Sequence, residues 1–143
     1  MIGRGGPGGV EAAPTPDELL MQARLLASRG IGNLGSTASR GAALLGRAAL
    51  EEALFGLFGE LRQLSGRATF LVLPNVFPRE PARRAAFAWG RLSAASHHHA
   101  YEMPPTAEEL DLILDTVHDV LEAVEGVKEA RRRKAAAVRA GGG

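Results

Sequence analysis

The sequence predicts an all-α fold. Two helix-start signals and two apolar stripes at helical spacing lead to this prediction. Thr15 with Glu18 has the spacing of a capping box, in which both side chains satisfy free backbone N–H groups. A second capping box is predicted at Thr106 with Glu109. One stripe consists of Leu50, Leu54, Leu57, Leu61 and Leu64, and the other of Leu110, Ile113, Leu114, Val117, Leu121 and Val124.

Composition limits the classes of protein and site that this chain can represent. Its 143 residues, 45% of them hydrophobic, are enough for one domain with its own core. The absence of cysteine excludes disulfides, thiolate catalysis and cysteine-based zinc sites. Apolar runs such as residues 70–73 are far shorter than the roughly 20 residues that cross a bilayer, and no secretory signal is visible. We therefore expect a cytoplasmic protein that has no membrane segment and no cofactor.

Glycine and charge divide the chain into three parts. Residues 1–14 form a glycine-rich leader that we expect to be disordered. Residues 15–127 contain the predicted helices of the bundle. Residues 128–143 are predicted to be a basic helical extension that ends in a flexible glycine tail.

The first two helices are predicted from their caps and glycines. The first begins after Thr15, and Gly30 is placed to end it. The second and longest runs from about residue 36 to about residue 66. Glycines weaken a helix interior, and we expect Gly56 and Gly59 to permit close approach of a neighbouring helix.

A connector and a third helix follow. Residues 70–76 are predicted to be a buried extended connector, because Pro74 interrupts their apolar run. The third helix starts near Pro81, which suits a first helical turn, and stops before Pro104. We expect this helix to be central and to carry the histidine block.

The fourth helix changes the sign of its charge along its length. Its first part has an acidic polar face formed by Glu108, Glu109, Asp111, Asp115, Asp119, Glu122 and Glu125. From Lys128 onward the charge is basic, with Arg131, Arg132, Arg133, Lys134 and Arg139 opposed only by Glu129. The run from Arg131 to Lys134 is a candidate RNA-phosphate site, and the alternative is a solvated basic end that complements the helix dipole.

Candidate chemistry is concentrated at the end of the third helix. His97, His98 and His99 are expected on its last turn, where His98 lies seven residues after Arg91 and almost on the same face. An arginine and a histidine on one face can cleave RNA without a metal, because histidine moves the 2′-hydroxyl proton and arginine stabilises the phosphorane charge. The alternative is that these histidines only complement the helix dipole.

No metal site is predicted. Adjacent histidines point in different directions, and although Glu102 follows His98 by four residues, the chain has no cysteine to complete a closed site. His118 lies among the acidic residues of the fourth helix, and we interpret it as a solvated histidine.

Three segments resemble one known family. They are the second helix RGAALLGRAALEEALFGLF, the connector FLVLPNVF, and the stretch AFAWGRLSAASHHHAYEMPPTAEEL. Together they are similar to the HEPN superfamily, in particular its SAV-type group of small bacterial proteins. The resemblance covers residues 17–124, and its most specific part is HHHAYEMPPTAEEL. The resemblance implies an all-α up-and-down bundle of four to five helices, often paired as a homodimer. In competent members it also implies an R-x(4-6)-H motif that forms a ribonuclease site across the dimer.

The resemblance assigns roles to individual residues. Arg91 matches the motif arginine, and either His97 or His98 matches the histidine. Competent members usually have a polar residue directly after the arginine, and this chain has Leu92. The residues expected to support the pair are His99, Tyr101 and Glu102.

Two functions follow as hypotheses. The first is a metal-independent endoribonuclease, the toxin of a bacterial phage-defence or toxin–antitoxin system, with RNA and an antitoxin as partners. The second is a non-catalytic dimeric helical module that binds protein or RNA. Members of the resembling family include both kinds.

Overall fold

The computed structural model describes residues 12–29, 35–97 and 105–142. Most of the predicted leader, residues 30–34 and the segment from residue 98 to residue 104 lie outside the described residues. Within them the fold is an all-α bundle without strands, as predicted. Its elements are α1 (Pro16–Ser28), α2 (Gly35–Leu57), η1 (Gly59–Gln63), α3 (Gly66–Val72), η2 (Leu73–Asn75), α4 (Arg79–Ser96) and α5 (Ala107–Gly141). No helix in these ranges is long and apolar enough to cross a membrane.

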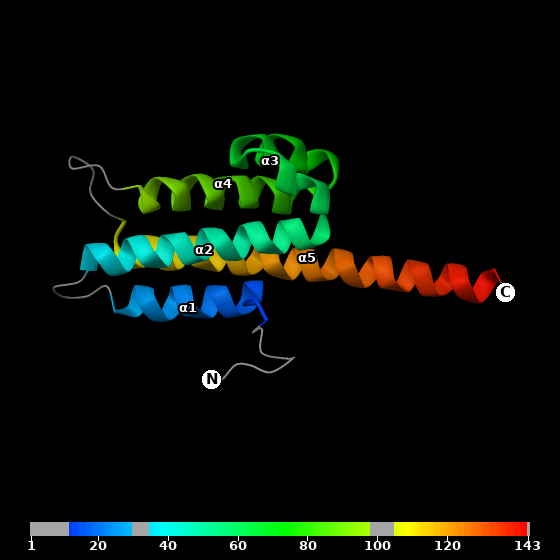
Figure 1. The fold of residues 1–143 in the computed structure, drawn as a ribbon, viewed down its shortest axis with the longest axis horizontal. Coiled ribbons are helices and arrows are strands. Elements are labelled where there is room, and N and C mark those ends of the chain that lie inside the picture. Colours follow the sequence, from blue (N-terminus) through cyan, green and yellow to red (C-terminus); the bar gives the residue numbers. More distant parts are fainter. Residues whose placement is uncertain (1–11, 30–34, 98–104, 143) are drawn as a thin grey trace, which may run out of the picture.

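The four long helices alternate in direction along the chain (Figure 1). α2 and α5 contact each other, and each of them also contacts both α1 and α4. This places α2 and α5 in the middle of the bundle, with α1 and α4 on either side. The short helix α3, together with η1 and η2, lies at the end of the bundle where α2 ends and α4 begins (Figure 1).

The core lies where α2, α4 and α5 meet. Leu50 and Leu54 of α2 are fully buried, as are Leu92 of α4 and Leu114 of α5. Gly46 allows this convergence, because a Cβ atom at Gly46 would lie 2.7 Å from Leu114 Cδ2 and 3.5 Å from both methyl groups of Leu92. The glycine therefore gives the side chains of two other helices room against the α2 backbone.

Both predicted capping boxes are confirmed. The Thr15 hydroxyl accepts a hydrogen bond from the Glu18 backbone N–H at 3.1 Å, and Glu18 accepts one from the Thr15 backbone at 2.8 Å. Thr106 and Glu109 form the same pair of bonds, each 3.0 Å long, at the start of α5. These two boxes fix where α1 and α5 begin.

The predicted end of the second helix is wrong. α2 stops at Leu57, and Phe58 leaves the helical conformation with φ −130° and ψ 82°. Phe58 turns into the core and meets the edge of Phe77, with their ring centroids 6.0 Å apart. The leucine spacing therefore continues through a 3₁₀ turn in η1, which still buries Leu61.

The predicted extended connector at residues 70–76 is also wrong. Ser65 accepts a hydrogen bond from the Ala68 backbone N–H and starts α3, and Pro74 lies in the first turn of η2. Phe70 packs on Trp89 with ring centroids 5.1 Å apart, while Leu71 faces solvent. Thr69, Phe70 and Leu73 are buried while Leu71 and Val72 are exposed, which is the three-to-four spacing of a helix.

Close glycine contacts occur at positions other than the predicted ones. A Cβ atom at Gly56 or Gly59 would meet nothing within 4 Å, so neither residue is needed for close packing. A Cβ atom at Gly41 would lie 2.7 Å from Leu26 Cδ2, and one at Gly66 would collide with the Trp89 ring. Helix approach therefore depends on Gly41 and Gly46 in α2.

α5 extends well beyond the bundle (Figure 1). It has 35 residues, against 23 in α2, and every residue from Ala130 to Gly142 is exposed. We call residues 130–141 the arm, which is about 18 Å long at 1.5 Å per residue. The predicted boundary between residues 127 and 128 falls inside this continuous helix.

Gly46 provides a test of the packing. Gly46→Val should lower the free energy of unfolding by about 2 kcal/mol, because the added methyl groups overpack Leu92 and Leu114. Gly56→Val is the matched control and should change it by no more than about 0.5 kcal/mol, since its side chain enters open space. Urea unfolding followed by circular dichroism measures both. Equal losses in the two variants would contradict a packing role for Gly46.

Candidate functional site

Arg91 lies on the surface between α4 and α5. Its side chain is 52% exposed, and Nη2 lies 3.5 Å from Glu109 Oε2. Glu109 is already held by the capping box at the start of α5. Exposed ion pairs contribute little to stability, so an anionic ligand can compete for this guanidinium.

His97 does not continue the α4 helix as predicted. α4 ends at Ser96, and His97 has an extended backbone with φ −96° and ψ 115°. The Ser93 carbonyl accepts hydrogen bonds from the Ser96 hydroxyl at 3.0 Å and from the His97 N–H at 3.3 Å. The candidates His98, His99, Tyr101 and Glu102 lie outside the described residues.

Leu92 has a packing role. It is fully buried in the core, against the position of Gly46 on α2. Arg91 and Leu92 therefore point to opposite environments, one to solvent and one to the core. The residue after Arg91 is not available to orient a reactive pair at the surface.

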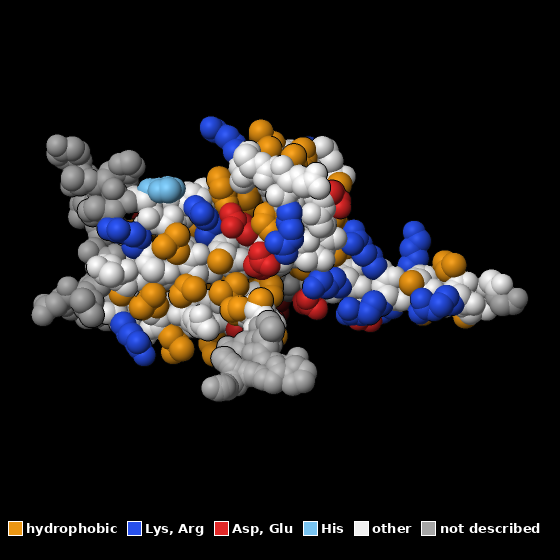
Figure 2. Space-filling model, in the orientation of Figure 1, with side chains coloured by type: hydrophobic (Ala, Val, Ile, Leu, Met, Phe, Trp, Pro, Cys, Tyr) orange, Lys and Arg blue, Asp and Glu red, His pale blue; other side chains and the backbone are white. Residues whose placement is uncertain are grey.

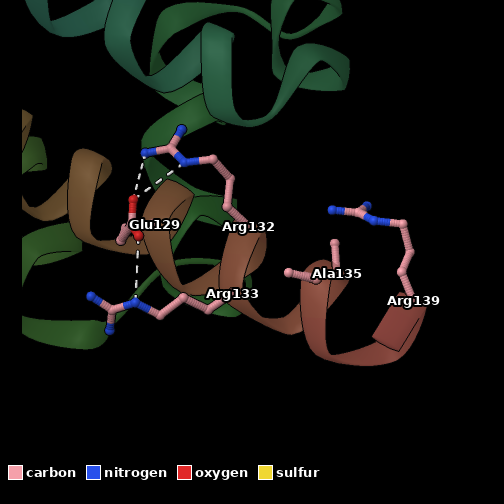
Figure 3. Close-up of a pocket in the computed structure, with 6 residues that line it drawn as sticks. Glu129, Arg132, Arg133, Ala135 and Arg139 are labelled. Carbon is pink, nitrogen blue, oxygen red and sulfur yellow. Dashed lines mark hydrogen bonds and ion pairs between the residues drawn. The ribbon is translucent and has the colours of Figure 1, made fainter. Parts of the chain in front are cut away.

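The arm carries the second group of candidate residues. Arg132, Arg133 and Arg139 line a shallow groove on one side of it, with Ala135 and Ala136 as its floor (Figure 3). Glu129 lies between the first two arginines, 2.9 Å from Arg132 Nη2 and 3.4 Å from Arg133 Nε. Figure 2 shows Lys and Arg side chains along the projecting helix, with acidic side chains only near the bundle.

Arg131 differs from its neighbours because it is engaged in the fold. Its Nη1 donates a hydrogen bond to the Leu57 carbonyl at 3.1 Å. Its guanidinium also lies 5.2 Å from the centre of the Phe58 ring. A cation at the C-terminus of α2 is favoured by the helix dipole. Arg131 therefore fastens the first turn of the arm to the end of α2.

One cluster with metal-ligand chemistry was not predicted from the sequence. His118, Asp119 and Glu122 lie on one turn of α5, with ligand atoms within 4.8 Å of one another. All three are exposed, and Asp119 Oδ2 is 3.2 Å from Arg84 Nη1. A cation there would compete with that guanidinium. In the sequence, Asp119 and Glu122 lie one and four residues after His118, and this spacing on a helix was the signal that could have predicted the cluster.

The pKa of Glu109 tests how Arg91 is held. The hydrogen bond donated by the Thr106 backbone N–H lowers this pKa most, followed by the Thr106 side chain and then the Arg91 charge. Thr106→Pro should therefore raise the pKa of Glu109 more than Arg91→Ala, as measured by carbon-13 NMR of the carboxyl group. Because the folded pKa is lowered, the stabilisation by Glu109 is present above the unfolded pKa and lost as the pH falls through the folded one. A larger rise in Arg91→Ala would make the ion pair the main partner.

Comparison with family models, with curated proteins and with solved structures gives no match to this chain. The candidate sites therefore stand on the sequence and on the geometry described above.

Proposed function

We propose that this protein is a non-catalytic helical module that binds RNA phosphates through the α5 arm. The observation that carries the proposal is a concentration of cations on an exposed helix. The arm contains no acidic residue, and its cationic residues are Arg131, Arg132, Arg133, Lys134 and Arg139. Apart from Arg131, these side chains lie on a part of α5 that is exposed on all sides.

Arginine chemistry favours phosphate as the ligand. A guanidinium presents a planar fork of donors that matches two phosphate oxygens. Arg132 and Arg139 lie seven residues apart, nearly on one line of the helix, with Ala135 between them (Figure 3). The small alanines leave a nucleic acid backbone room to approach both arginines.

The composition of the arm also predicts low sequence preference. Phosphate contacts fix position and carry no base information. The arm has no aromatic residue for base stacking and no asparagine or glutamine for adenine edges. We expect affinity to depend on RNA length and salt much more than on base sequence.

Removing the two aligned arginines tests the proposal. The double variant Arg132→Ala with Arg139→Ala should weaken binding of a single-stranded RNA oligonucleotide. It should also reduce the slope of log affinity against log salt by about 1.4, since each phosphate contact on a single strand releases about 0.7 counterion and two contacts are lost. Fluorescence anisotropy at several salt concentrations measures both quantities.

A control variant distinguishes RNA binding by the arm from general attraction by the positive charge of the chain. The pair Arg67→Ala with Arg79→Ala removes the same charge from α3 and from the start of α4, and both residues are exposed. This control should bind RNA with nearly the affinity of the unmodified chain. If it weakened binding as much as the arm variant, non-specific charge and not the arm would hold the RNA.

Metal-independent RNA cleavage is a second candidate. It rests on the HEPN resemblance and on one observation, the half-exposed Arg91 guanidinium close to the point where α4 leads into the histidines. In this candidate the protein is a toxin whose dimer completes the site, and an antitoxin is its protein partner.

Incubation with RNA in EDTA discriminates the two functions. Under our proposal the purified protein leaves RNA intact at any concentration that saturates binding, as seen on a denaturing gel. Cleavage that persisted in EDTA and disappeared in Arg91→Ala, His97→Ala or His98→Ala would replace the binding module with the ribonuclease. Arg67→Ala is the control and should behave as the unmodified protein.

A further inference from the structure

An exposed apolar surface lies on the segment formed by α3 and η2. Its large hydrophobic side chains that face solvent are Leu71, Val72 and Val76, and we call these three residues the apolar tip. Leu71 is 75% exposed, more than any other large hydrophobic side chain in the described ranges. Figure 2 shows hydrophobic side chains at the outer surface of α3, with a basic side chain beside them.

The fold uses the opposite face of this segment. Phe70, Leu73 and Phe77 are buried and hold the segment against the bundle. Leu71 lies two residues from both Thr69 and Leu73, which are buried, and two residues rotate a helical position by about 200°. Leu71 therefore points away from the bundle. Packing within the single chain does not account for the apolar character of the tip.

Arginines flank the apolar tip on both sides in the sequence. Residues 68–78 contain no charged side chain, while Arg67 precedes them and Arg79 follows them. Both arginines are exposed. The nearest acidic residue in the sequence, Glu80, is paired with Arg83 at 2.6 Å. The segment thus presents apolar side chains to solvent between two exposed cations.

We propose that the apolar tip inserts into the surface of a membrane that contains anionic lipids, with Arg67 and Arg79 bound to lipid phosphates. Apolar side chains on such proteins enter the boundary between head groups and acyl chains, about 5–10 Å deep. A guanidinium presents a fork of donors that matches two phosphate oxygens. Each basic residue close to an anionic surface raises the affinity by about fivefold. The attachment is peripheral, because only the tip enters the lipid.

Shape and charge favour a lipid surface over other partners. α3 lies beyond α4, on the side of the molecule away from α1 (Figure 1). A projecting surface can enter a bilayer, whose lipids move aside, whereas a protein partner needs a matching hollow. RNA offers no apolar layer to the tip. Residues 58–84 contain five arginines and two glutamates, and this net charge of +3 complements anionic head groups. Neither the arm nor Arg91 takes part.

Single cysteines give the first test, because the chain has no cysteine of its own. Leu71→Cys, Leu112→Cys and Val138→Cys replace side chains that are 75%, 66% and 65% exposed, and each carries a nitrobenzoxadiazole label. Vesicles of phosphatidylcholine with phosphatidylserine should shift the emission of the label at position 71 to shorter wavelength. The label at position 112 should not change, and the label at position 138 reports adsorption through the arm.

A charge on the tip gives the second test. Leu71→Asp should weaken binding to the same vesicles by about tenfold or more, because burial of a leucine side chain contributes at least about that factor. Leu25→Asp is the matched control, since Leu25 is 56% exposed on α1, and it should bind as the unmodified chain does. Vesicle flotation measures binding, and circular dichroism checks the fold of each variant.

The flanking arginines separate lipid binding from RNA binding. Arg67→Ala with Arg79→Ala should lower the affinity for anionic vesicles by about thirtyfold and leave the affinity for RNA nearly unchanged. Arg132→Ala with Arg139→Ala should weaken RNA binding and keep the emission shift of the label at position 71. Either proposal can therefore fail while the other stands.

Three results overturn the lipid proposal. The first is an unchanged label at position 71 in anionic vesicles, including the case in which only the label at position 138 shifts, because the arm alone would then adsorb. The second is an equal loss of binding in Leu71→Asp and Leu25→Asp. The third is a shift at position 71 that appears without vesicles as the protein concentration rises, because a second copy of the chain would then cover the tip.

Discussion

The packing of α5 against α2 at Gly46 is the constraint on which the rest of the structure depends. Leu114 of α5 and Leu92 of α4 both occupy the space that a side chain at Gly46 would fill. This contact holds the first half of α5 in the middle of the bundle. α2 ends at Leu57, so the second half of α5 has no long helix beside it and becomes the arm. The length of α5 relative to α2 therefore creates the exposed basic surface.

Charge follows the same division. Along the bundle, acidic residues of α5 pair with arginines of its neighbours, as in Arg24 with Asp115 and Arg84 with Asp119. At the base of the arm, the single acidic residue Glu129 forms ion pairs with Arg132 and Arg133. The acidic half is therefore partly neutralised by the fold, whereas most of the basic half is left to solvent. A chain of net charge +1 can thus present a strongly positive end.

Local signals predicted the starts of α1 and α5, whereas the ends of α2 and α4 were predicted wrongly. Thr15 and Thr106 cap their helices through bonds within four residues, which the sequence alone reveals. The end of α2 depends on Phe58 turning toward Phe77 and Arg131, partners that are distant in the sequence. At the end of α4 the Ser96 hydroxyl and the His97 N–H both donate to the Ser93 carbonyl. This local bond of Ser96 was not predicted from the sequence. Of the two candidate sites, the basic stretch after Lys128 is helical as predicted, up to Gly141, and its binding of RNA stays a prediction. The predicted shared face of Arg91 and His98 assumed that the helix continues through the histidines, whereas α4 ends at Ser96.

Leu92 links the core to the candidate chemistry of Arg91. The side chain at this position points between α2 and α5, where its methyl groups lie against Gly46. A polar residue here would be buried in an apolar environment, and an unsatisfied polar group in such a place costs about 1–3 kcal/mol. No single polar substitution at this position can therefore add a surface neighbour to Arg91 without loss of packing. The arm has no such conflict, because its arginines can contact a ligand while the core stays unchanged.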